Sequence, residues 1–205
     1  EAGHAVHSFL SRDLELTGYK NLPSEVAELA SMSMELLTMN EWSEFYKEAD
    51  HKRAKKDQLE TILTILPWIA QIDEFQHWVY EHPQHTVAER TEKWLNLGKE
   101  YGANLTDWTG CEDVRACSWQ RQMHLFEVPF YYIEYGFAQL GAIGVWKNSL
   151  ENTDQAIEQY KAALQLGYTK SIPEIYETAG VSFQFSQSYI KEIADFLQLE
   201  LNKFE

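Results

Sequence analysis

Glu1 and His4 have the spacing that places two side chains on one face of an α-helix. Residues three or four apart on a helix are neighbours, and the chain begins with E-x-x-H. One more His in front would complete H-E-x-x-H, in which both His side chains bind one Zn²⁺ and the Glu acts as general base on a polarised water. In that pattern His4 is a metal ligand and Glu1 the general base. The first ligand would be the residue before Glu1.

A catalytic zinc site of this kind needs a third protein ligand, which is commonly a Glu. The next expected helix, residues 24–37, carries Glu25, Glu28 and Glu35. Glu28 lies beside apolar residues such as Leu29, and an unpaired buried carboxylate is costly, so Glu28 is the candidate ligand. The spacing leaves an alternative equally open, in which these are surface residues favoured by helix propensity.

The elements that must position these side chains are almost all helices. Apolar periodicity, two capping boxes and the placement of Pro and Gly mark their limits. Helices are expected over residues 1–17, 24–37, 41–66, 67–80, 86–100, 129–146, 153–166, from 171 and from 186 to the end. Pro67 is expected to break or kink the chain between two of them. No alternating apolar pattern persists, so we predict an all-α fold, with residues 1–205 forming a single domain.

Composition excludes several classes of partner. The formal net charge of −15 argues against nucleic acids and anionic membranes, whose phosphates select basic surfaces. The longest apolar stretch, LTILPWIAQI, is too short to span a bilayer. Cys111 and Cys117 are the only cysteines; a disulfide is an open alternative, but two reduced thiols are favoured. We therefore expect no nucleic-acid or membrane partner, and a cytoplasmic location.

Three stretches together resemble a known family. EAGHAVHSF, SEVAELASMSMELL and HLFEVPFYYIEYGFAQLGAI are similar to the catalytic C-terminal region of oligoendopeptidase F-type zinc peptidases, which belong with the thimet oligopeptidases. In that family the Glu ligand lies in a motif like E-x-x-S-x-x-x-E, which Glu28, Ser31 and Glu35 match. The likeness extends through PEIYETAGV and so covers essentially the whole chain.

The resemblance implies an all-helical zincin fold with a deep channel, one Zn²⁺, and cleavage of short peptides. It assigns His4 and Glu28 as ligands and Glu1 as general base. The chain departs from the family in two ways: the first His of H-E-x-x-H and the long helical N-terminal region that walls the channel are both missing. We therefore expect a C-terminal part of the catalytic domain, truncated on its N-terminal side. By itself it should be inactive and bind zinc poorly, and its partner is the missing N-terminal part.

The resemblance also implies a role for the region from His124 onward. Peptide hydrolysis passes through an oxyanion, which neutral hydrogen-bond donors stabilise. In the family a His and tyrosines supply them, and the Y-x-x-Y spacing carries that role to Tyr132 and Tyr135, with His124 matched less securely. The alternative is that these rings and Tyr131 are aromatic core.

Two other hypotheses compete. TDQAIEQYKAALQLGY is typical of a tetratricopeptide helix, which would make the chain a helical interaction module without catalysis, but a second copy of the repeat is not found. A helical bundle with a carboxylate-bridged metal site needs E-x-x-H on two helices, and only the pair Glu1 and His4 has that spacing.

Overall fold

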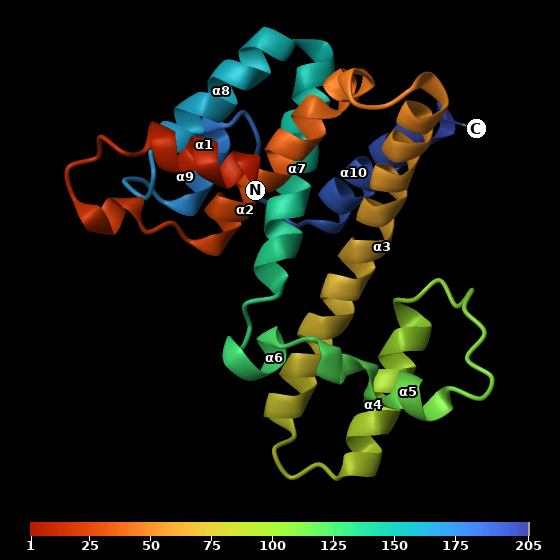
Figure 1. Ribbon diagram of the computed structural model, residues 1–205. Coiled ribbons are helices and arrows are strands. Elements are labelled where there is room, and N and C mark those ends of the chain that lie inside the picture. The colour runs from red at the N-terminus through yellow and green to blue at the C-terminus, as the bar shows by residue number, and fades with distance from the viewer. Residues whose placement is uncertain (205) are drawn as a thin grey trace. The chain divides into compact units, whose positions relative to one another are not determined.

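The computed structural model describes residues 1–204, and it is all-helical, with no strand among those residues (Figure 1). The predicted fold class is therefore confirmed. The chain divides into two compact units. One consists of Glu1–Ile62 together with the chain from Phe137 onward, and the other is Leu63–Gly136. Two long helices, α3 (Glu48–Glu81) and α7 (Ile133–Glu151), each contribute residues to both units.

The first unit is built from the two ends of the chain. Its further helices are α1 (Ala2–Leu10), α2 (Ser24–Leu37), α8 (Thr153–Gln165), α9 (Ile172–Thr178) and α10 (Gln187–Asn202), with 3₁₀ segments at Thr17–Lys20 and Thr38–Glu44. Residues 138–146 of α7 are all buried, as a helix that is apolar on every side should be. Within this unit α1 packs on α2, and α8 packs on α9.

The second unit is organised around an aromatic core. Its further helices are α4 (Val87–Glu100), α5 (Glu112–Cys117) and α6 (His124–Glu127), with a 3₁₀ segment at Ser118–Arg121. Ile72, Phe75, Trp94 and Leu97 form its buried centre. The Trp94 ring meets Phe75 edge-on at 5.1 Å between centroids, a geometry that adds to the burial of both rings. The two thiols of the chain, Cys111 and Cys117, are unpaired and exposed.

The predicted helix limits are confirmed in some places and wrong in others. The helix at 24–37 and both capping boxes, at Thr86 and Ser171, are present as predicted. The first helix ends at Leu10 instead of residue 17, and at its C-cap both the amide and the hydroxyl of Ser11 donate to the His7 carbonyl (3.0 and 2.9 Å).

Pro67 does not interrupt α3, which is continuous from Glu48 to Glu81, whereas residues 38–44 are 3₁₀. A helix-interior proline costs about 3 kcal/mol. Ile62 and Ile69, on either side of it, are only 1% and 2% exposed, and fully burying one such side chain stabilises by about 1.5–3 kcal/mol. Burial of the apolar face of α3 therefore offsets the cost of the proline.

Candidate active site

Close packing of α1 against α2 brings the predicted ligands together. Gly3 faces the backbone of α2, and a Cβ at this position would overlap the Ala30 carbonyl oxygen. Only glycine permits two helix backbones to approach so closely. His4 follows Gly3 and Glu28 precedes Ala30 by two residues, so this contact sets the separation of the two side chains. The role of Gly3 could not be predicted from sequence, because the atoms it contacts lie on a separate helix.

His4 and Glu28 meet across this helix pair. The His4 Nε2 atom lies 3.6 Å from Glu28 Oε2, and both side chains are partly exposed, by 37% and 20%. The Ser31 hydroxyl donates to the same carboxylate oxygen at 2.7 Å, which restricts the rotation of the Glu28 side chain. The distance between His4 and Glu28 is too long for a good hydrogen bond, so the two atoms are near each other without being bonded.

The separation of these atoms fits a shared zinc ion. With metal–ligand bonds of about 2.1 Å in tetrahedral geometry, two ligand atoms lie about 3.4 Å apart. The observed 3.6 Å is close to that value. An imidazole nitrogen and a carboxylate oxygen also belong to the His₂Glu donor set of catalytic zinc sites. His4 and Glu28 could therefore hold Zn²⁺ as two of three protein ligands.

The other acidic and histidine residues near this pair do not complete a metal site. Glu1 is the exposed N-cap residue of α1, and its carbonyl accepts a hydrogen bond from the Ala5 amide. Among residues 1–204, no three His, Cys, Asp or Glu side chains form a group that could hold a metal. His7 is 1% exposed and both its ring nitrogens lack a partner. Burial, with His4 nearby, lowers the pKa of His7 to about 4, so His7 is neutral at physiological pH.

Two buried tyrosines from other helices donate hydrogen bonds to the backbone of α2. The Tyr160 hydroxyl of α8 donates to the Ala30 carbonyl at 2.7 Å, and the Tyr176 hydroxyl of α9 donates to the Glu25 carbonyl at 2.9 Å. Burial raises the pKa of both phenols above the ordinary value, so both remain protonated donors. These bonds satisfy buried carbonyls and fix α2 along its length.

The predicted oxyanion residues form a ring cluster in the second unit. The ring of His124 lies 5.0 to 5.8 Å, between centroids, from those of Tyr131, Tyr132 and Tyr135. The Tyr135 hydroxyl is 3.4 Å from His124 Nε2, while His124 Nδ1 is buried without a partner. We call these four residues the His124 cluster. Three tyrosine rings and an imidazole are thus held close together.

A strained turn places the tyrosines beside His124. The helix predicted to start at Pro129 starts instead at Ile133, because Phe130 has a left-handed backbone with φ of +63°. Such a conformation is rare for a bulky residue and needs support. The Phe130 amide donates to Gln76 Oε1 of α3 at 3.0 Å, and this bond holds the turn. Gln76 and Phe130 are positioning residues that the sequence analysis missed, because their pairing spans distant parts of the chain.

Comparison with known proteins assigns the chain to a class. The model of peptidase family M3 matches residues 1–195, so this chain belongs to the family of M3 peptidases. The oligoendopeptidase F homolog of Borreliella burgdorferi is 26% identical over 176 residues, which cover 83% of this chain and 29% of that protein. The predicted resemblance is confirmed, and it favours a peptidase over the tetratricopeptide alternative.

Solved structures show the same relationship in three dimensions. PZ peptidase A, solved with an inhibitor, is 34% identical with a TM-score of 0.90 over 99% of this chain and 36% of that one. A Bacillus anthracis (strain Ames) protein assigned as an oligoendopeptidase F is 32% identical with a TM-score of 0.79, over 99% and 33%. The chain spans about a third of the length of the relatives it matches. No helix within residues 1–204 is both long and apolar enough to cross a membrane.

Proposed function

We propose that the protein containing this chain is a zinc-dependent endopeptidase that hydrolyses short peptides, and that residues 1–205 form the C-terminal part of its catalytic domain. The observation that carries the proposal is the 3.6 Å approach of His4 to Glu28 from separate helices, at a separation suited to a shared zinc ion. The donor set and the family membership point to the same chemistry.

In this proposal each residue has a separate task. His4 and Glu28 hold the metal, with a His directly before Glu1 as the third ligand. The bound zinc would supply Lewis acidity to the attacking water and to the scissile carbonyl. Glu1 accepts the proton of that water and passes it to the leaving amine. Tyr132 and Tyr135, with His124, donate hydrogen bonds to the oxyanion as negative charge develops there.

The proposed partners follow from the family. Short peptides are the substrates, and the N-terminal part of the same protein completes the walls of the channel. A cytoplasmic location belongs to the same proposal and can be checked by fractionation of the source cells.

The first test is the codon that precedes Glu1 in the gene. A His codon completes H-E-x-x-H, and any other residue overturns the zinc assignment. The second test measures hydrolysis of a fluorogenic short peptide by the complete protein, before and after chelation and after zinc is restored. His4→Ala and Glu28→Gln should abolish zinc-restored activity. Glu25→Gln is the control, since Glu25 is held to Tyr176 through its backbone carbonyl, which the substitution retains. Activity that survives in either ligand variant would contradict the proposal.

A further inference from the structure

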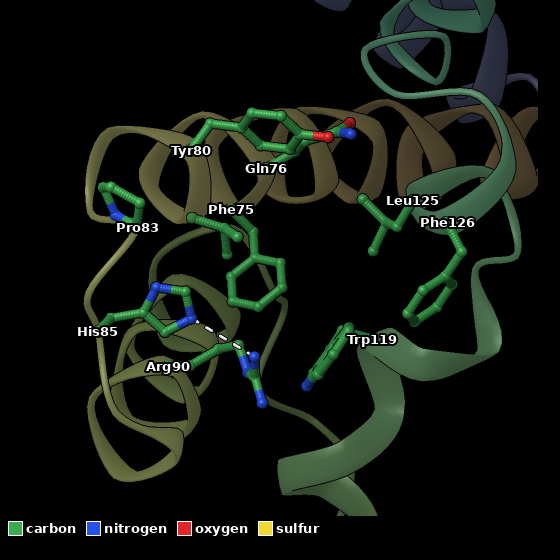
Figure 2. A pocket seen from close by; sticks show the side chains of 10 residues that line it. Phe75, Gln76, Tyr80, Pro83, His85, Arg90, Trp119, Leu125 and Phe126 are labelled. Carbon is green, nitrogen blue, oxygen red and sulfur yellow. Dashed lines mark hydrogen bonds between the residues drawn. The ribbon is translucent and has the colours of Figure 1, made fainter.

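The second unit contains a cavity that the proposed mechanism does not use. It lies between α3, α4, the 3₁₀ segment Ser118–Arg121 and α6, and has a volume of about 440 Å³ (Figure 2). Apolar walls come from Phe75, Trp119 and Leu125. The three tyrosines of the His124 cluster are not among its lining residues. Apolar cavities of this size, with a few convergent polar groups, are typical of sites for small ligands.

Arg90 supplies a cation at this cavity. Its guanidinium lies over the Trp119 ring, 5.2 Å from the centroid. Among residues 1–204, no carboxylate forms an ion pair with Arg90, although nine other lysine and arginine side chains each pair with one. Arg90 is half-buried, and a cation without an anion in such a place is suited to an anionic ligand.

His85 holds the guanidinium in position. The His85 Nδ1 atom lies 2.6 Å from the His82 carbonyl, to which it donates. The neutral ring then has an acceptor at Nε2, and Arg90 donates to it at 3.4 Å, the bond drawn in Figure 2. Because His85 carries no negative charge, this bond orients Arg90 without neutralising it.

Gln76 adds a second donor to the wall. It is only 3% exposed, and its Oε1 accepts the Phe130 amide proton. That bond determines which end of the amide is the nitrogen. Gln76 Nε2 is buried and has no partner within residues 1–204. A buried amide donor without an acceptor is unusual in a folded protein and is satisfied when a ligand supplies an oxygen.

We propose that this cavity binds the C-terminal residue of a peptide whose last side chain is large and apolar. The terminal carboxylate pairs with Arg90, the side chain packs among Phe75, Trp119 and Leu125, and Gln76 Nε2 donates to a ligand oxygen. The polar lining offers donors and a cation but contains no Asp or Glu. A free amino acid would therefore place its ammonium group beside Arg90 without a counterion, and the two positive charges would repel each other. The nitrogen of a peptide bond is neutral and avoids this repulsion.

The inference stands on the cavity and not on the zinc site, so a metal-free binding measurement tests it. We would titrate N-acetyl-L-phenylalanine, N-acetyl-L-phenylalaninamide and free L-phenylalanine into the 205-residue chain by isothermal titration calorimetry, with EDTA present. The acetylated acid should bind at least about tenfold more tightly than the amide or the free amino acid. Equal binding of acid and amide, or no binding of the acid at millimolar concentration, would overturn the proposal.

Variants locate the site. Arg90→Gln should remove the preference for the acid over the amide, while Arg90→Lys should keep part of it, because a lysine retains the charge but not the forked geometry. Arg121→Gln is the control: Arg121 is exposed in the neighbouring 3₁₀ segment, and its substitution also removes one positive charge. This variant should keep the preference for the acid over the amide. A preference that persists in Arg90→Gln would also overturn the assignment. If Arg90→Gln fails to fold, the comparison of acid with amide on the unaltered chain still tests whether the cavity prefers a carboxylate.

Discussion

The hydroxyl groups of Tyr132 and Tyr135 are the atoms through which the proposed oxyanion stabilisation acts. Changing either tyrosine to Phe keeps the ring in the His124 cluster and removes one donor. Loss of one such donor lowers kcat by about 10²–10³. KM should change little, because the hydrogen bond strengthens only in the transition state. Steady-state kinetics of both variants in the complete protein would measure this.

The aromatic-core alternative gives the opposite pattern. If the tyrosines only pack, each Phe variant keeps kcat within about two- to threefold of the unaltered protein. The substitution then lowers Tm instead, because losing a hydrogen bond costs about 1 kcal/mol of stability. Unchanged kcat in both variants would end the oxyanion assignment.

Ser31 would influence the proposed zinc ligands through its contact with Glu28. Its hydroxyl donates to Glu28 Oε2 at 2.7 Å, and loss of a group that orients a metal ligand weakens metal binding by about 10–100-fold. Ser31→Ala in the complete protein should therefore raise the Kd for zinc by that factor, as measured by competition with a chelating dye.

Ser33→Ala is the matched control on the same helix. Ser33 is fully buried and its hydroxyl has no partner among the described residues, so its removal should leave the zinc Kd unchanged. Equal effects of the two variants would show that Ser31 influences only the folding of α2.

Contact between α1 and α2 can be tested at Gly3. In a helix, alanine is more favourable than glycine by about 1 kcal/mol, so Gly3→Ala would be stabilising if the position were open. The new Cβ would instead overlap the Ala30 carbonyl, and overpacking of this kind costs about 1–3 kcal/mol. Thermal unfolding should show a Tm lower by roughly 2–10 °C.

Gly18→Ala is the control for that experiment. Gly18 lies in the Thr17–Lys20 segment, and a Cβ there would meet no atom within 4 Å. The Tm of Gly18→Ala should therefore match or exceed that of the unaltered chain. A Gly3→Ala variant that is equally stable would show that α1 can shift without cost.

Helices α3 and α4 are joined by a carboxylate whose protonation should affect stability. Glu74 accepts hydrogen bonds from Lys93 and from the Tyr101 hydroxyl, each at 2.7 Å. These bonds, that from Lys93 first, lower the pKa of Glu74 below its ordinary value of 4.5 and, with burial, raise that of Tyr101 to about 12. Stability from a depressed carboxylate pKa is present above the unfolded pKa and is lost as pH falls through the folded one.

Glu74→Gln should therefore lower Tm at neutral pH, and the difference from the unaltered chain should shrink as pH falls below 4.5, the ordinary pKa of Glu74. Glu81→Gln, at the exposed end of α3, controls for the loss of one negative charge. If the Tm difference between Glu74→Gln and the unaltered chain stays constant with pH, the ion pair of Glu74 is not the cause of the lower Tm.

The chain as a whole should bind zinc weakly when residues 1–205 are prepared alone. Metal affinity depends on the number of ligands and on the folding of the site, and among residues 1–204 no group of three candidate ligands occurs. After dialysis, elemental analysis should find zinc well below one equivalent, and peptide hydrolysis should be absent. Stoichiometric zinc would show that a ligand has been overlooked. If the proposed function is right, the complete protein should instead bind one equivalent of zinc.

The sequence alone was sufficient for what depends on neighbours along the chain. Helical periodicity and the capping boxes at Thr86 and Ser171 predicted an all-α fold, since these interactions close within one or two turns. The identity of the candidate ligands, His4 and Glu28, also came from sequence, through their motifs and the resemblance to a family. Their roles in binding zinc stay a prediction.

Only the tertiary structure revealed what depends on contacts between distant residues. The overlap that makes Gly3 necessary involves Ala30, and the left-handed turn at Phe130 depends on Gln76. Local propensity predicted a helix from Pro129 onward, and a long-range hydrogen bond overrode it. The cavity beside Arg90 is likewise absent from any sequence pattern, because its walls come from α3, α4, the 3₁₀ segment Ser118–Arg121 and α6. Packing chooses among conformations that the local sequence leaves nearly equal in energy, so these features appear only in the folded chain.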